Sequence, residues 1–199
     1  RSRGLGDVYK RQALAVVFGF CAVAIIGIMV YFSCIDTKTD LGSFERIIRF
    51  NDIWGTHRGF MWVRSIWIFG DASFIEKLFG VGPDMFYSAF SPYFDDLSKY
   101  GDSSTNAAHN EYLNYLITIG ITGLLSYLAI VCGTIKNAVK YAKENPMLIA
   151  CVSAVICYAV QSVVNLYQPI TTPLFFIFIA LCEAFVRNAK AEKSAVSAV

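Results

Sequence analysis

Two ionisable side chains stand out for the chemistry they can perform. Arg58 lies in "HRGFMWVRSIWIF", and His109 opens the stretch "HNEYLNYLITIGITGLL". The planar guanidinium of an arginine can grip two phosphate oxygens and never loses its charge. The imidazole of a histidine exchanges its proton near neutral pH, so it can deprotonate a hydroxyl group. What either group acts on depends on the elements that position it.

Each of these side chains also has an explanation without chemistry. Arg58 can be a solvated loop residue or a partner of Asp52, and His109 can be a helix-start residue near a cap such as Asn106. Glu111 is then simply favoured by the positive end of the helix. Ionisable groups at membrane depth are nevertheless functional candidates. We therefore keep Arg58 and His109 as candidates, and we expect Asn110 to support His109 by hydrogen bonding.

The composition is that of a membrane protein. Of the 199 residues, 56% are hydrophobic and 16% are charged, whereas soluble domains contain about a quarter charged residues. The six cysteines lie in or at the ends of apolar runs and form no CxxC pair, so they predict packing residues rather than a disulfide framework or a zinc site.

The first segment does not fit the rest of the chain. Residues 1–12, "RSRGLGDVYKRQ", lack the apolar core of a signal peptide and resemble a translated sequencing-adapter remnant. We set this segment aside, and we expect the remaining chain to be the C-terminal part of a longer protein.

Four apolar runs approach the roughly 20 residues that a membrane-spanning helix needs. Lysine and arginine in the 136–146 connection and the 188–199 tail favour the cytoplasm for both segments. Residues 35–111 then lie outside the membrane. The sequence therefore predicts an all-α integral membrane protein with about four spans and a large, mainly helical extracytoplasmic loop between the first two. The predicted spans are 13–34, 112–135, 147–166 and the shorter 172–187.

The long external segment predicts a folded cap rather than a linker. Between positions 56 and 69, Phe60, Val63 and Trp67 share one helical face, while Arg58 and Trp62 share another. Such an aromatic amphipathic helix is typical of a membrane interface.

Several other residues have expected places. Arg64 is expected at the interface beside Trp67, with lipid phosphate binding left open, and His57 is expected to be structural. The segment "GVGPDM" at 80–85 predicts a tight turn, and glycines 120, 123 and 133 predict close helix packing.

Two polar residues at one-turn spacing belong to the third predicted span. Gln161 and Asn165 should face the interior of the helix bundle. There they either line a substrate cavity or bond between helices, and the sequence does not decide between the two.

Three of these stretches occur in one order. "HRGFMWVRSIWIF", "LFGVGPDMF" and "NAAHNEYLNYLITIGITGLL" resemble the external-loop pattern of the O-antigen ligase and O-antigen polymerase family. The shared elements are an arginine four residues before a tryptophan, a GxG turn followed by an aromatic residue, and a His-Asn pair that opens a helix with a Gly-Ile-x-Gly stretch. The resemblance covers about residues 55–125.

The resemblance implies a membrane glycosyltransferase of the bacterial cytoplasmic (inner) membrane. It would transfer a glycan from a polyprenyl-diphosphate carrier to an acceptor glycan or glycolipid, in lipopolysaccharide or capsule synthesis. Arg58 would bind the diphosphate, Trp62 would stack on a sugar or brace the loop, and His109 would activate the acceptor hydroxyl. The resemblance implies no metal, cofactor or nucleotide, and we expect no nucleic-acid partner.

One departure and one alternative remain. A further arginine that the family carries in earlier helices has no counterpart here, which puts the activity of the isolated chain in doubt. The alternative function is a transporter or flippase component that binds the same lipid-linked glycan without breaking a bond. Nearly charge-free spans and an elaborate outer loop favour the enzyme.

Overall fold

The computed structural model describes residues 3–197, and every regular element in that range is a helix. The predicted all-α class is therefore confirmed. The chain divides into two compact units, Arg1–Phe60 and Met61–Val199. The boundary falls inside the helix α3 (Trp54–Asp71), and each unit is described by itself.

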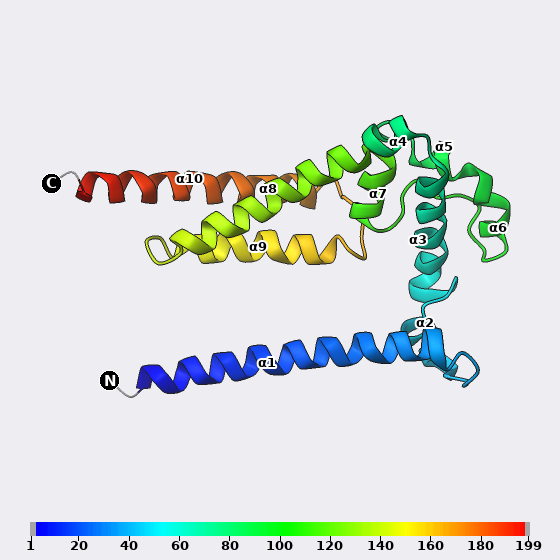
Figure 1. The fold of residues 1–199 in the computed structure, drawn as a ribbon, viewed down its shortest axis with the longest axis horizontal. Coiled ribbons are helices and arrows are strands. Elements are labelled where there is room, and N and C mark those ends of the chain that lie inside the picture. Colours follow the sequence, from blue (N-terminus) through cyan, green and yellow to red (C-terminus); the bar gives the residue numbers. More distant parts are fainter. Residues whose placement is uncertain (1–2, 198–199) are drawn as a thin grey trace. The chain divides into compact units, whose positions relative to one another are not determined.

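The first unit begins with one long apolar helix. α1 (Arg3–Val30) continues into a π-helical turn, η1 (Tyr31–Ile35), and so covers the predicted span 13–34 (Figure 1). Large apolar side chains along it are exposed, with Phe20 at 74% and Val23 at 69%. The helix begins inside the 1–12 segment that we set aside, and residues 1 and 2 lie outside the described range.

A single arginine organises the connection that follows α1. The short helices η2 (Gly42–Phe44) and α2 (Glu45–Ile48) lead to Arg49. Its guanidinium donates to the carbonyl oxygens of Phe32 at 3.1 Å and Thr39 at 2.7 Å. It also forms an ion pair with Glu45 at 2.6 Å. Arg49 thus ties the end of α1 to the chain that enters α3.

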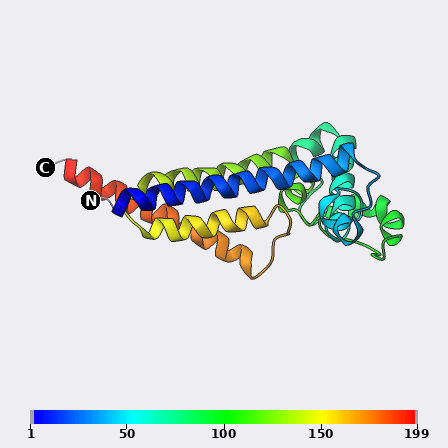
Figure 2. The same ribbon diagram turned by 90° about the horizontal axis from the view of Figure 1, so that it is seen from below.

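The second unit contains a group of short helices followed by three long ones. The long helices α8, α9 and α10 run alongside one another (Figures 1 and 2). The elements after α3 are α4 (Phe74–Phe79), α5 (Phe86–Phe90), η3 (Ser91–Tyr93), α6 (Phe94–Ser98), α7 (Glu111–Thr118), α8 (Gly120–Tyr141), α9 (Met147–Gln161) and α10 (Thr171–Ser197).

Two apolar clusters hold the three long helices together. One contains Ala138, Leu148 and Val186, and the other is built around Tyr127 and Phe175. Cys151 and Cys182 are buried in the first cluster, so they act as packing residues there.

The outward faces of these helices are apolar as well. Val160 of α9 is 67% exposed and Ile177 of α10 is 52% exposed. Among the described residues, α8 alone is long and apolar enough to cross a membrane, and only 17% of its most apolar window is buried. Gly19–Ile35 and Met147–Gln161 are apolar but shorter. The predicted number of four spans and the predicted topology stay predictions.

The helix boundaries differ from the predicted ones in three places. The predicted span 112–135 is two helices, because α7 ends at Thr118 and α8 begins at Gly120, whose φ is +70°. The helix α9 ends at Gln161 rather than at 166, and α10 continues to Ser197, well beyond 187.

Candidate functional site

His109 sits in a strained loop immediately before α7. Its φ is +50°, a conformation that residues other than glycine adopt rarely. Ala107 and Ala108 before it are buried, while the imidazole is half-buried. The side-chain oxygen of Asn110 accepts a hydrogen bond from the backbone N–H of Leu113 at 3.1 Å, which caps α7. The cap and the buried alanines fix the backbone on both sides of His109.

Glu111 anchors this loop to the end of α9. The residue is 1% exposed, and its backbone N–H donates to the carbonyl oxygen of Ser162 at 2.9 Å. The Ser162 hydroxyl donates in return to Glu111 Oε2 at 2.7 Å. The Tyr115 hydroxyl donates to Oε1 at 2.8 Å. A buried polar group is stable only when it is bonded in this way. The two bonds to Ser162 join α7 to the end of α9, and the bond from Tyr115 holds the carboxyl group within α7.

Tyrosines surround the Glu111 carboxylate and connect all the long helices. Tyr112 donates to the carbonyl oxygen of Ala159 at 2.7 Å. The hydroxyls of Tyr158 and Thr172 lie 2.7 Å apart. Within the described chain, Asn114 Oδ1 and the Tyr127 hydroxyl are buried without a hydrogen-bond partner. The interior of the bundle is therefore polar at this end. The polar residues Glu111 and Tyr112 follow His109 closely in the sequence.

The GxG turn at 80–82 packs against the break between α7 and α8. The backbone N–H groups of Val81 and Gly82 donate to the carbonyl oxygens of Ile117 at 2.9 Å and Thr118 at 3.0 Å. The Thr122 hydroxyl donates to the carbonyl oxygen of Leu78 at 2.7 Å.

Only glycine fits at the two closest points of this contact. A Cβ atom at Gly80 would collide with the backbone of Thr118, and one at Gly120 would collide with the backbone of Leu78. Gly80 and Gly120 also have positive φ values of +77° and +70°. The predicted turn at 80–85 and the predicted close packing at Gly120 are thus one contact.

The α9–α10 connection also reaches this turn. The Tyr167 hydroxyl donates to Asp84 Oδ1 at 3.2 Å. Burial, and then the neighbouring Asp84 carboxylate, raise the pKa of Tyr167 above its ordinary value. Tyr167 therefore stays a protonated donor in neutral solution.

The side chains in the second half of α3 form cation–π and aromatic contacts. The Arg64 guanidinium lies 4.8 Å from the centre of the Trp67 ring, as expected for two neighbours on one side of the helix. The rings of Trp67 and Tyr93 are 6.4 Å apart. Trp62 is half-buried, and Ser65 is fully buried.

In the first unit, Arg58 follows an unusual stretch of backbone. Gly55, Thr56 and His57 all have left-handed dihedral angles, with φ values of +57°, +57° and +67°. A β-branched residue such as Thr56 pays about 1–3 kcal/mol for this conformation. Gly59 lies so close to the carbonyl oxygen of Asn51 that a Cβ atom there would collide with it.

The backbone N–H of Phe60 also donates to the carbonyl oxygen of Asp52 at 3.3 Å, so the chain is held directly after Arg58, whose side chain is half-exposed. Arg58 and His109 belong to different units. The roles that the family resemblance implies require both side chains to reach one substrate, and that convergence stays a prediction.

The two polar residues of the third predicted span do not lie as expected. Gln161 is exposed rather than enclosed by the bundle, and Asn165 accepts a hydrogen bond from the adjacent N–H of Leu166 at 3.0 Å. The helix ends between them, so the predicted one-turn spacing does not apply. Ser162 takes the inward position instead, where it bonds Glu111. Sequence reasoning missed both Ser162 and the burial of Glu111.

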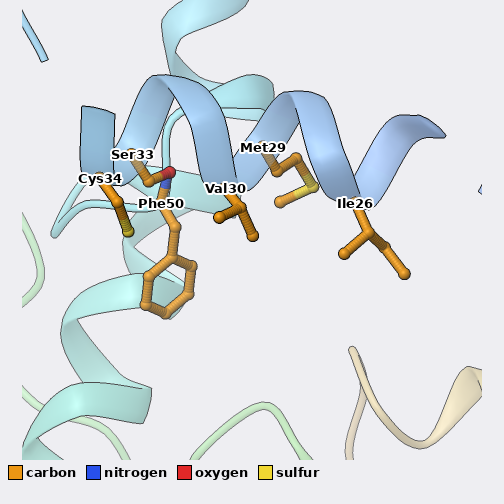
Figure 3. Close-up of a pocket in the computed structure, with 6 residues that line it drawn as sticks. All are labelled: Ile26, Met29, Val30, Ser33, Cys34 and Phe50. Carbon is orange, nitrogen blue, oxygen red and sulfur yellow. The ribbon is translucent and has the colours of Figure 1, made fainter. Parts of the chain in front are cut away.

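The first unit contains an apolar cavity of about 310 Å³ near the end of α1. The Phe50 ring is part of its lining, and the backbone N–H of Phe50 donates to the Ser33 hydroxyl at 2.7 Å (Figure 3). Its lining residues are Ile26, Met29, Val30, Ser33, Cys34 and Phe50.

Comparison with known proteins identifies one family. The family model described as O-antigen ligase matches residues 5–128, which is more than half of the chain. The match includes Arg58, the GxG turn and the His109 loop, and it begins within the 1–12 segment. No curated protein and no solved structure matches the chain. The chain belongs to the O-antigen ligase family, whose members act in a membrane in the synthesis of surface polysaccharides.

Proposed function

We propose that this protein transfers a glycan from a polyprenyl-diphosphate carrier to an acceptor glycan or glycolipid at the outer face of the bacterial cytoplasmic membrane. The observation that carries the proposal is the family match, which includes both Arg58 and His109. The fixed backbone around each residue supports it, because catalytic groups must be held in place before the substrate arrives.

The two residues have complementary tasks in this reaction. Arg58 binds the diphosphate and stabilises the negative charge that develops on it as it leaves. His109 accepts the proton of the attacking acceptor hydroxyl. Further substrate contacts are proposed for Trp62, Arg64, Asn110, Gln161 and Asn165.

The reaction requires a particular topology. In our proposal residues 13–34, 112–135, 147–166 and 172–187 span the membrane, and residues 35–111 lie outside. The exposed apolar side chains of α1, α8, α9 and α10 support membrane contact on those helices. The break at Gly120 is compatible with a span, since other backbone groups there satisfy the freed hydrogen bonds.

The positive φ of His109 limits the substitutions that can test its role without disturbing the loop. Asparagine adopts positive φ values readily, so His109→Asn removes the imidazole without straining the loop further. We expect the rate of glycan transfer to fall by about 10²–10⁴-fold, as for loss of a general base. His57→Asn is the matched control, because His57 also has a positive φ of +67°. Transfer by the His57 variant should remain within a few-fold of the original rate.

Arg58 is tested by two substitutions. Arg58→Ala removes the charge, and we expect transfer to fall by about 10²–10³-fold. Arg58→Lys keeps the charge but loses the planar fork, so an intermediate loss is expected. Lys99→Ala removes an exposed charge elsewhere in the same loop and should have no effect. Normal transfer by correctly localised Arg58→Ala and His109→Asn proteins would refute the assigned roles.

Release of the carrier separates an enzyme from a transporter. Purified protein is mixed with labelled polyprenyl-diphosphate-linked glycan and acceptor in detergent. An enzyme forms the new glycosidic bond and releases free polyprenyl diphosphate. Binding of the lipid-linked glycan without that product would favour the transporter alternative.

A further inference from the structure

A basic cavity lies at the opposite end of the long helices from His109. It has a volume of about 420 Å³ and is formed by the last turns of α8 and α10. Its lining residues are Tyr141, Lys190, Lys193 and Ser194. The cavity lies wholly within the second unit.

Several ammonium groups converge on the Tyr141 ring. The Nζ atoms of Lys140 and Lys190 lie 5.4 Å and 5.6 Å from the centre of the ring. Lys193 Nζ lies 3.6 Å from a carboxylate oxygen of Glu144. Two positive charges thus lie against one ring, and a third, that of Lys193, lines the same cavity, where the ion pair with Glu144 balances it. The remaining positive charges repel one another, and an anion placed between them would relieve the repulsion.

The surroundings indicate which anion would enter. Apolar helix surfaces continue from the cavity along α8, where Val139 is 60% exposed, so the cavity lies at the edge of the apolar zone. The Ser194 hydroxyl donates to the carbonyl oxygen of Lys190 at 3.0 Å and forms part of the wall. A ligand with a phosphate group and an attached apolar tail would match both surfaces.

We propose that this cavity binds the phosphate group of an anionic phospholipid, with Lys190 as the principal contact and Lys193 as the second basic residue of the lining. Basic pockets between helix ends on the cytoplasmic side are suited to such head groups. The site is separate from the glycan-transfer residues and needs no bond to be broken. A free phosphate ion has the same binding chemistry, so the experiment must distinguish the two sources.

Spin-label spectroscopy tests the proposal in vesicles that contain the purified protein. Phosphatidylglycerol and phosphatidylcholine are labelled on the acyl chain, and the fraction of immobilised lipid is measured for each. We expect a preference for phosphatidylglycerol of about fivefold, the factor that one lysine near an anionic surface contributes. The Lys190→Gln/Lys193→Gln variant should lose it. The Lys190→Arg/Lys193→Arg variant should keep it.

The matched control removes the same charge from the same end of the bundle. Lys136→Gln/Lys143→Gln changes two exposed lysines that do not line the cavity, and this variant should keep the preference. Equal losses in both glutamine variants would mean general surface attraction and overturn the proposal. No preference in the original protein would also overturn it. Displacement of the labelled lipid by millimolar inorganic phosphate would assign the cavity to a soluble phosphate instead.

Discussion

At the scale of single residues, Glu111 is the side chain whose environment the sequence conceals. Acidic residues are common in the first turn of a helix because they complement its positive end. From the sequence alone, that explanation is sufficient for Glu111. The structure adds that Ser162, fifty-one positions away, donates a hydrogen bond to its carboxylate. The carboxylate therefore serves as a link between α7 and α9 and holds the loop that carries His109.

A double-mutant cycle measures that link. Ser162→Ala removes one donor, and we expect it to lower the free energy of unfolding by about 1–2 kcal/mol. Glu111→Ala leaves the buried Ser162 hydroxyl and the half-buried Tyr115 hydroxyl without their acceptor and should cost about 2–5 kcal/mol. The double variant should lose less than the sum, by about 1 kcal/mol or more, because the two residues share one bond. Thermal unfolding in detergent checks this, and strictly additive losses would contradict the link.

At the scale of elements, the chain joins two glycine-containing segments that are distant in sequence. The turn at 80–85 binds the backbone at the α7–α8 break, and neither side leaves room for a Cβ atom. This contact explains why a long apolar stretch bends where it does. It also positions the break only nine residues after Glu111, near the loop that contains His109.

The same substitution at two glycines of α8 tests this contact. Gly120→Ala places a methyl group against the Leu78 backbone at a φ of +70°, and we expect it to lower the free energy of unfolding by about 2–4 kcal/mol. Gly133→Ala meets open space in the middle of the helix and should raise it by about 0.5–1 kcal/mol. Thermal unfolding of both variants gives the comparison. Equal stability of the two would show that the turn does not depend on Gly120.

Some of these elements could be predicted from the sequence and others could not. Apolar runs are local signals, so the helices that cover 13–34 and begin at 147 were predictable. The break at Gly120 was not, because hydropathy does not register backbone dihedral angles. The inward place of Ser162 was hidden for a related reason: α9 ends one residue earlier, and a periodicity argument assumes a continuing helix. Arg58 and His109 were found by residue type and motif order.

At the scale of the whole molecule, the proposed function depends on which side of the membrane each segment faces. Lys99 belongs to the predicted outer loop, and Lys143 belongs to the predicted cytoplasmic connection; both side chains are exposed. Single cysteines are introduced at these positions after the six natural cysteines have been replaced by alanine. In intact cells a membrane-impermeant maleimide should label Lys99→Cys, and it should label Lys143→Cys only after the membrane is opened.

This labelling pattern tests the location of both proposed sites, the glycan-transfer residues and the basic cavity. A lipid-linked glycan displayed outside can reach His109 only if the 35–111 segment is outside, while the basic cavity meets the cytoplasmic leaflet only if α8 and α10 end there. The reverse pattern would refute the topology and the outer-face reaction together. Labelling of both cysteines in intact cells would place both positions outside, with an even number of spans between them, and the predicted single span 112–135 would have to be reassigned. The cysteine-free protein, labelled in parallel, gives the background that either conclusion must exceed.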